Sequence, residues 1–159
     1  VDGVLGSKEA VSMIDTAVET ITSFDGKVFY TQDTHGEDYL DTEEGRHLPV
    51  VHCIKGSQGW KIHPKIEKAL LLKDATGIEK STFGSEKLMG IIEKEVPDVE
   101  SITLIGICTD ICVISNAMLA KAHFQNTPVS VISSACAGVT PESHENALEA
   151  MKMCHIEIQ

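Results

Sequence analysis

Short apolar runs alternate along the chain with segments whose apolar residues recur every three or four positions. The runs predict buried strands, which lie at Lys27–Thr31, Ala69–Lys73, Ser101–Ile107, Val129–Ser133 and His155–Ile158. The spaced segments predict helices, which lie at Lys8–Phe24, Ser85–Glu95, Asp110–His123 and Ser143–Cys154. Strands that alternate with helices in this way predict one α/β domain, with a parallel sheet covered by helices on both faces.

Capping residues mark the predicted helix ends. Ser7 precedes the first helical segment and Gly26 follows it, in positions that suit an N-cap and a C-cap. Pro97 follows the second helix, and Ser143 is placed to cap the last one.

Composition is that of a globular domain with an acidic surface. The 159 residues carry a formal net charge of −11, which disfavours nucleic-acid backbones and anionic membrane surfaces as partners. No apolar run approaches the roughly 20 residues that cross a bilayer. The five cysteines are an odd number in a chain of ordinary size, so reduced thiols in the cytoplasm are expected in place of a disulfide framework.

In parallel α/β folds the chemistry gathers at the carboxyl ends of the strands. Polar segments follow three of the predicted strands, at Gln32–Trp60, Asp74–Phe83 and Cys108–Cys112. The first segment is long for a connection, and such segments are often functional or partly disordered. Catalytic side chains are therefore expected in these segments.

Cys112 follows a strand and a turn of small residues, at or near the start of the next helix. The free N–H groups and the dipole of a helix N-terminus stabilise a thiolate, and the same N–H groups can hold a tetrahedral oxyanion. This placement predicts a nucleophilic cysteine. Two alternatives remain open: a buried cysteine that only packs, and a metal pair formed by Cys108 and Cys112, whose spacing resembles no common zinc knuckle.

A carboxylate and an imidazole lie close together at the end of the first predicted strand. Asp33 and His35 point the same way in an extended chain, and such a pair suits a divalent transition metal. His52 is expected to complete the set, with Glu44 or Asp41 as a further oxygen ligand. The alternative is a solvated Asp and His in a polar loop.

Lys80 lies in the loop expected between the second predicted strand and the second helix. A lysine close to a cysteine stabilises the thiolate by its charge. The alternative is an ordinary surface charge.

Taken together, these segments resemble the isochorismatase-like cysteine hydrolases, a family that includes the nicotinamidases. The resemblance spans nearly the whole chain in the right order, and its matching segments are Asp33–His35, Val51–Trp60, Lys80–Phe83, Thr109–Val113 and Pro141–Leu148. The segment around Cys112 is the most specific of them.

The resemblance implies a fold, a reaction and a set of catalytic residues. The fold is a three-layer α/β/α domain with a mostly parallel, Rossmann-like sheet. Cys112 would attack an amide carbonyl, Lys80 would help to hold it as a thiolate, and water would then cleave the thioester. The backbone N–H groups of Cys108 and Cys112 would form the oxyanion hole, and the family's cis peptide would fall between Ile107 and Cys108.

The resemblance also implies a divalent metal ion that orients the substrate by binding its pyridine nitrogen. Asp33, His35 and His52 would be ligands, with Glu44 as the fourth; zinc is the expected ion, with manganese or iron as alternatives. The favoured reaction is hydrolysis of nicotinamide to nicotinate and ammonia, in NAD salvage. Another small amide or carbamoyl compound is the alternative substrate, and a non-catalytic binding protein is the alternative outside enzymes. A homo-oligomer is expected by analogy with relatives.

Two departures from the family pattern bear on the site. The family's first strand ends in a catalytic Asp, and that strand is expected upstream of Val1, because Asp2 lies in what resembles the segment after it. No aromatic residue shortly precedes His52, where some nicotinamidases line the pyridine pocket, so Phe83 or Trp60 would serve instead.

The role of Cys53 stays open. The other thiols and imidazoles are expected to be structural or at the surface: Cys108, Cys136, Cys154, His63, His123, His144 and His155.

Overall fold

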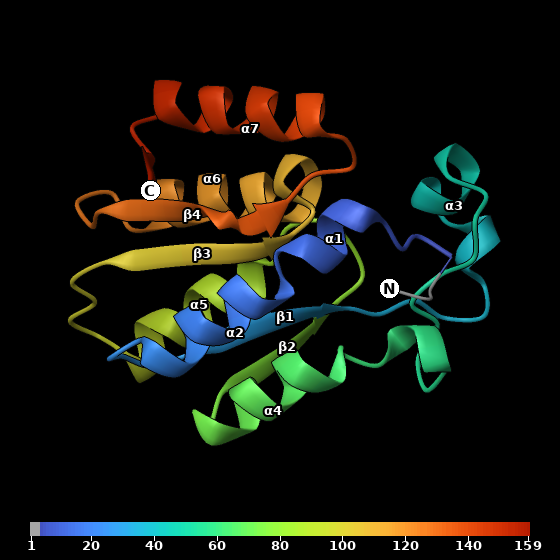
Figure 1. Cartoon of the computed structure of the whole chain (residues 1–159), viewed down its shortest axis with the longest axis horizontal. Coiled ribbons are helices and arrows are strands. Elements are labelled where there is room, and N and C mark those ends of the chain that lie inside the picture. The colour runs from blue at the N-terminus through green and yellow to red at the C-terminus, as the bar shows by residue number, and fades with distance from the viewer. Residues whose placement is uncertain (1–3) are drawn as a thin grey trace.

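A parallel β-sheet forms the middle of the fold (Figure 1). Its strands are β1 (Phe29–Asp33), β2 (Thr76–Lys80), β3 (Ile102–Ile107), β4 (Val129–Ala137) and β5 (Glu157–Ile158). Ladder hydrogen bonds join β1 to β2, and join β4 to both β3 and β5. The computed structural model describes residues 4–159, so Asp2 lies outside the described residues. Within residues 4–159 no ladder joins β1 to β3, so the sheet has two parts.

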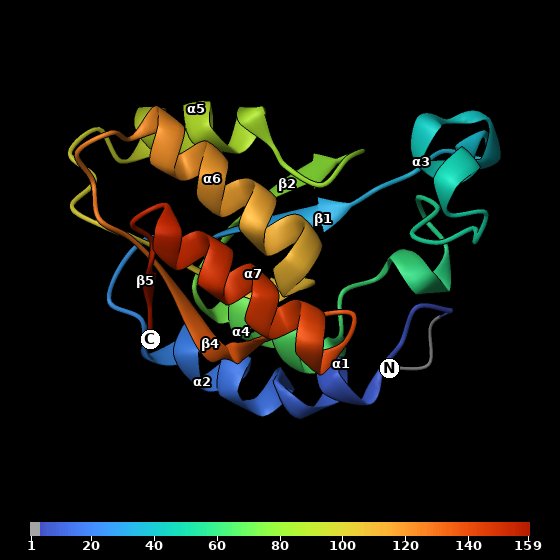
Figure 2. The same ribbon diagram turned by 90° about the horizontal axis from the view of Figure 1, so that it is seen from above.

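Helices cover both faces of the sheet (Figure 2), which confirms the predicted α/β class. One face carries α1 (Lys8–Ser12), α2 (Ile14–Ser23) and α4 (Pro64–Leu72), and the other carries α5 (Glu86–Glu95), α6 (Ile114–His123) and α7 (Pro141–Met153). The short helix α3 (Glu43–His47) lies apart from both layers, beyond the carboxyl ends of the strands (Figure 1). None of the described helices is both long and apolar enough to cross a membrane.

The largest hydrophobic core lies between the sheet and the layer of α5, α6 and α7. Its most deeply buried large side chains are Ile78, Val129, Val131, Met151 and Ile156. Burying a side chain of this size stabilises the fold by about 1.5–3 kcal/mol. This packing anchors the strands and holds their carboxyl ends side by side.

The connection after β1 is folded back on the strand and is not a disordered loop. The register of β1 and β2 places Asp33 opposite Lys80, at the ends of two neighbouring parallel strands. Beyond β1, an isolated parallel bridge pairs His35 with Ile54, and the His35 N–H donates to the Cys53 carbonyl at 3.0 Å. The two ends of the stretch from His35 to Ile54 are thereby brought together. The turn η1 (Tyr39–Asp41) lies within this stretch, and the turn η2 (Gln58–Trp60) follows it.

The strand expected at Ala69–Lys73 is wrong, because this run lies mostly in helix α4. Pro64 stands in the first turn of α4, and the side chain of His63 accepts a hydrogen bond from a backbone N–H of that turn. Both features mark a helix start. Leu70 is buried whereas Leu71 is 76% exposed, so the leucine run has one apolar face and one exposed face.

The strand missing from the sequence-based prediction is β2. It is short, and only the alternate residues Ile78 and Lys80 are buried. A strand with so few apolar residues gives a weak hydrophobic signal. Lys80 is therefore the last residue of a strand, and its predicted place in a loop is wrong. Strand β4 likewise continues beyond its predicted end at Ser133 to Ala137.

Helix boundaries differ from the prediction in several places. The third helix, expected from Asp110, begins at Ile114 as α6. The first segment is divided at Met13 into α1 and α2, although Ser7 caps α1 as predicted. Gly26 is not the C-cap, because α2 ends ahead of it at a residue with extended backbone. Thr140 caps α7 in place of Ser143, which lies inside the first turn and completes a capping box with Thr140.

Candidate active site and metal centre

Cys112 lies in a wide turn between β3 and α6. The peptide bond between Ile107 and Cys108 is cis, as the family resemblance implies. The turn η3 (Thr109–Val113) follows, and the Cys108 carbonyl accepts the N–H of Val113 at 3.0 Å, a bond of the π-helical type. Cys112 thus lies within η3, shortly before Ile114 begins α6, and so near a helix N-terminus as the sequence predicts.

Lys80 reaches Cys112 from the end of β2. Its ammonium group donates to Asp33 Oδ1 at 2.8 Å and to the Thr82 carbonyl at 2.9 Å, and it lies 3.5 Å from Cys112 Sγ. Lys80 is only 8% exposed, so these contacts are largely shielded from water. An ordinary surface charge, the alternative for this residue, is therefore ruled out.

The charges around Cys112 act in opposite directions. Burial raises the pKa of the Cys112 thiol, the Lys80 ammonium lowers it, and the Asp33 carboxylate raises it, with a net rise. Burial lowers the pKa of Lys80, but its hydrogen bond to Asp33 and the charge of a Cys112 thiolate leave that pKa above its ordinary value. Lys80 is therefore a cation at neutral pH and stabilises the thiolate. A cation bound to Asp33 would offset the opposing effect of the carboxylate.

The other cysteines lack this balance. Burial raises the pKa of Cys108 and of Cys136 to about 11, and no neighbouring cation opposes the rise. Burial and the Asp33 carboxylate raise the pKa of Cys53 to about 11 despite the charge of Lys80. Among the described cysteines, Cys112 is the one in direct contact with a cation, which favours it as the nucleophile.

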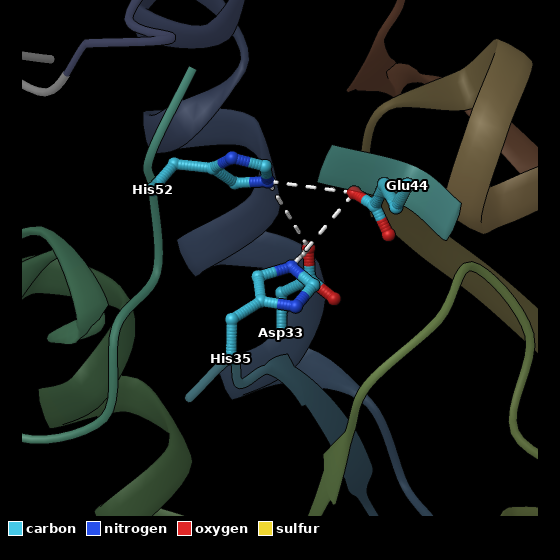
Figure 3. A group of neighbouring side chains, drawn as sticks. All are labelled: Asp33, His35, Glu44 and His52. Atoms are coloured by element: carbon cyan, nitrogen blue, oxygen red, sulfur yellow. Dashed lines mark ion pairs between the residues drawn. The ribbon is translucent and has the colours of Figure 1, made fainter. Parts of the chain in front are cut away.

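Two imidazoles and two carboxylates converge beyond the end of β1 (Figure 3). Asp33 ends β1 and His35 follows it, Glu44 comes from α3, and His52 comes from the chain beyond α3. One ligand atom from each of the four lies within 4.8 Å of the other three. These are the four ligands predicted from the sequence, and Asp41, the alternative oxygen ligand, is not in the group.

The geometry of this cluster suits a small divalent cation. His35 Nε2 lies 3.7 Å from Asp33 Oδ2 and 3.8 Å from Glu44 Oε1. His52 Nε2 lies 4.0 and 3.6 Å from the same two oxygens. A tetrahedral ion with ligands at about 2.0–2.2 Å keeps its ligand atoms roughly 3.3–3.6 Å apart, slightly closer than these. In the part of the chain that the structure describes, His35 Nε2 is buried without a hydrogen-bond partner, and a bound cation would satisfy it.

Neighbouring groups hold both imidazoles in place. His52 Nδ1 donates to the Val50 carbonyl at 2.7 Å, so its Nε2 carries the lone pair that faces the cluster. The ring of Tyr39 is fully buried and packs against His35 and His52, with centroids 4.8 and 5.0 Å away. The Tyr39 hydroxyl donates to the Leu48 carbonyl at 2.9 Å. The candidate ligands are therefore held in position by their surroundings.

Asp33 belongs to both clusters. Its Oδ1 accepts the hydrogen bond from Lys80, and its Oδ2 faces His35 and His52. One carboxylate thus lies between the lysine that contacts Cys112 and the point on which the candidate ligands converge. The candidate nucleophile and the candidate metal centre therefore adjoin each other through Asp33.

Two polar residues of the site carry structural roles that the sequence analysis did not assign. His144, expected at the surface or in packing, pairs with Thr109 Oγ1 at 2.8 Å and with Ser133 Oγ at 3.3 Å. It thereby links α7 and β4 to the fully buried Thr109 beside the cis peptide. Asn116 is buried on the inner face of α6. The sequence could have indicated Asn116, because it is a polar residue on an otherwise apolar helix face. Nothing in the sequence indicated that Tyr39 packs against the two histidines.

The two aromatic candidates for a pocket wall differ in exposure and bonding. Trp60 donates its indole N–H to Thr34 Oγ1 at 2.9 Å, and its carbonyl accepts from Gln32 Nε2 at 2.7 Å. These bonds tie the end of the long connection to the residues around Asp33. Phe83 is 42% exposed and is the more accessible of the two to a ligand.

Solved structures with the same fold include nicotinamidases and pyrazinamidases. The nicotinamidase/pyrazinamidase of Bacillus subtilis is similar with a TM-score of 0.82 at 25% identity, over 95% of this chain and 86% of that chain. The pyrazinamidase of Pyrococcus horikoshii in complex with zinc has a TM-score of 0.81 at 26% identity, over 99% and 89%. The yeast nicotinamidase has a TM-score of 0.83 at 14% identity, over 99% and 91%, a likeness of fold alone. No curated protein sequence matches the chain.

The similarities to solved structures are distant, and the family is assigned by a match to a family model. The model described as the isochorismatase domain matches residues 1–158, nearly the whole chain. The cis peptide falls where the resemblance implied, and the segments that carried the resemblance meet at one edge of the sheet. The chain belongs to the isochorismatase family of hydrolases.

Proposed function

We propose that this protein is a cysteine-nucleophile amidohydrolase that converts nicotinamide to nicotinate and ammonia. The observation that carries the proposal is the 3.5 Å contact between Lys80 Nζ and Cys112 Sγ, beside a cluster of metal-ligand side chains. A buried cation next to a thiol is a recurring way to activate a cysteine nucleophile. Similarity to the Bacillus subtilis nicotinamidase/pyrazinamidase supports a small carboxamide as the substrate.

In the proposed reaction, Cys112 attacks the amide carbon as a thiolate, and a tetrahedral oxyanion forms. The backbone N–H groups of Cys108 and Cys112 stabilise that oxyanion. The Cys108 backbone N–H lowers the pKa of the Cys112 thiol, which supports this role. As the C–N bond breaks, the leaving nitrogen takes up the proton that the thiol lost and departs as ammonia. Water then attacks the thioester, releases the carboxylate and restores the Cys112 thiol.

Asp33, His35, Glu44 and His52 would hold one divalent ion, which supplies a binding point for the ring nitrogen of the substrate. Two imidazoles and two carboxylates suit zinc, and they also accommodate manganese or iron. The Pyrococcus horikoshii pyrazinamidase solved with zinc supports zinc as the ion. These side chains would fix that binding point relative to Cys112, because Asp33 contacts both the other candidate ligands and Lys80.

The wider setting in this proposal is a cytoplasmic homo-oligomer that takes part in NAD salvage. All five cysteines are free, including the exposed Cys154, and free thiols suit a reducing compartment.

Ammonia release from nicotinamide by the full-length, metal-loaded protein tests the proposal. Cys112→Ala is expected to lower turnover by at least about 10³-fold, because the covalent step is lost, while the protein stays folded. Cys154→Ala is the matched control, since it also removes one thiol but at an exposed position away from Lys80. Appreciable turnover in Cys112→Ala would rule out Cys112 as the nucleophile. No ammonia release by folded, metal-loaded wild type would rule out nicotinamide and direct the test to other small amides and carbamoyl compounds.

A further inference from the structure

Asn116 of helix α6 connects the turn that carries Cys112 with the segment that follows Lys80. Its side chain is buried, with only 5% of the residue exposed. Its Nδ2 donates to the Cys112 carbonyl at 2.8 Å and to the Phe83 carbonyl at 3.1 Å. Its Oδ1 accepts from the Ser85 N–H at 3.0 Å. One carboxamide thus makes three hydrogen bonds that join two separate elements.

The segment bound by Asn116 also holds the side chain of Lys80. The Thr82 carbonyl accepts from Lys80 Nζ at 2.9 Å, and it is next along the chain to the carbonyl that Asn116 binds. Gly84, in the same segment, lies so close to α6 that a Cβ there would come within 2.7 Å of Leu119 Cδ1. The position of the segment relative to Cys112 is therefore set by its contacts with α6.

We propose that Asn116 is a positioning residue, which holds the Lys80–Ser85 segment against the Cys112 turn and so keeps Lys80 Nζ in contact with Cys112 Sγ. The inference rests on the proposed nucleophilic role of Cys112, but it does not depend on the identity of the substrate. Small misplacements of a catalytic group have large effects on rate. Loss of the two bonds from Asn116 to residues 80–85, called the lysine segment below, should therefore slow the reactions of Cys112.

Asn116→Ser separates the two halves of this contact. A serine hydroxyl in a helix bonds the carbonyl four residues earlier, as Ser115 Oγ does with the Ile111 carbonyl at 2.6 Å. The variant is therefore expected to keep a bond to the Cys112 turn and to lose both bonds to the lysine segment. Ser115→Ala is the matched control, because it removes one hydrogen bond within the same turn and none to the lysine segment.

The readout is the rate at which iodoacetamide alkylates Cys112 in metal-loaded protein, followed by peptide mass spectrometry across a range of pH. This rate follows the thiolate and needs no substrate, so a wrong substrate assignment does not affect it. Asn116→Ser is expected to slow alkylation of Cys112 at neutral pH by about tenfold, because a displaced Lys80 no longer lowers the pKa of the thiol. Ser115→Ala is expected to leave the rate within about twofold of wild type.

Lys80→Met supplies the second arm of the test. Adding Asn116→Ser to Lys80→Met is expected to change the alkylation rate no further, because the cation to be positioned is absent. Equal slowing by Asn116→Ser with and without Lys80 would overturn the proposal, because the amide would then act on the turn and not through the lysine. A wild-type rate in Asn116→Ser, with slow alkylation in Lys80→Met, would also overturn it. A wild-type rate in Lys80→Met would overturn both this inference and the activation of Cys112.

Circular dichroism and thermal unfolding establish whether each variant is folded. Asn116→Ala, which leaves room for a bridging water, replaces Asn116→Ser if the serine variant does not fold. Failure of both variants to fold would overturn the proposal, because Asn116 would then be required for folding itself.

Discussion

Removing the metal ion should destabilise the fold, because it leaves His35 Nε2 buried without a partner within residues 4–159 and two carboxylates close together. The side chains of His35 and His52 are 4% and 6% exposed, and those of Glu44 and Asp33 are 16% and 25% exposed. Two carboxylates then face each other with no cation between them, and His35 Nε2 has no partner among the described residues. An unsatisfied buried polar group costs about 1–3 kcal/mol.

The size of the effect follows from binding linkage. An ion that binds only the folded state stabilises it by about 2.7 kcal/mol when its concentration is about a hundred times Kd. For a domain of this length, about 1 kcal/mol corresponds to a change of roughly 2–4 °C in Tm. Saturation with zinc is therefore expected to raise Tm by about 5–11 °C over chelated protein.

Thermal unfolding after chelation, repeated with zinc, manganese or iron(II) restored, measures this shift. Glu44→Gln is expected to lose most of the metal-dependent rise in Tm, whereas Glu43→Gln keeps it. The two residues are neighbours on α3, but the side chain of Glu44 is 16% exposed and faces the histidines, while that of Glu43 is 77% exposed. A Tm that no metal raises, or an equal response in both variants, would refute the metal site.

Two further predictions concern buried groups near the site. Tyr39→Phe removes the hydrogen bond to the Leu48 carbonyl, so we expect the free energy of unfolding to fall by about 1–2 kcal/mol and metal affinity, measured by calorimetric titration, to weaken; unchanged affinity would limit Tyr39 to packing. Burial raises the pKa of Cys136 from 9.0 to about 11, so the unfolded chain loses this proton first as the pH rises. The stabilisation from this thiol is therefore complete below pH 9 and lost between about pH 9 and 11, and Cys136→Ala should reduce the alkaline loss of stability by about 2 kcal/mol at pH 11. Urea unfolding across this range measures it, and a variant whose profile parallels wild type would contradict burial as the cause.

Prediction from the sequence succeeded where the signal is local. Ser85 was predicted at the start of a helix, and it caps α5 by accepting a hydrogen bond from a backbone N–H one turn later. The strand ahead of Cys112 is a continuous apolar run, and β3 lies there. Prediction failed at Ala69–Lys73, where an apolar run has the composition of either a buried strand or one face of a helix. Pro64 marks the start of a helix, but it lies upstream of the run and the run alone does not contain this signal.

The sequence by itself determined which residue types follow each strand, and a parallel sheet brings those strand ends to one edge. The family, the cis peptide position and the candidate ligands followed from motifs that are contiguous in the chain. Tertiary structure alone decided that Asp33 serves two clusters, that Tyr39 packs against both histidines, and that Asn116 joins two segments. The physical reason is that hydrogen bonds and ring contacts between distant segments depend on register and packing, which leave no periodic pattern in the residues that make them.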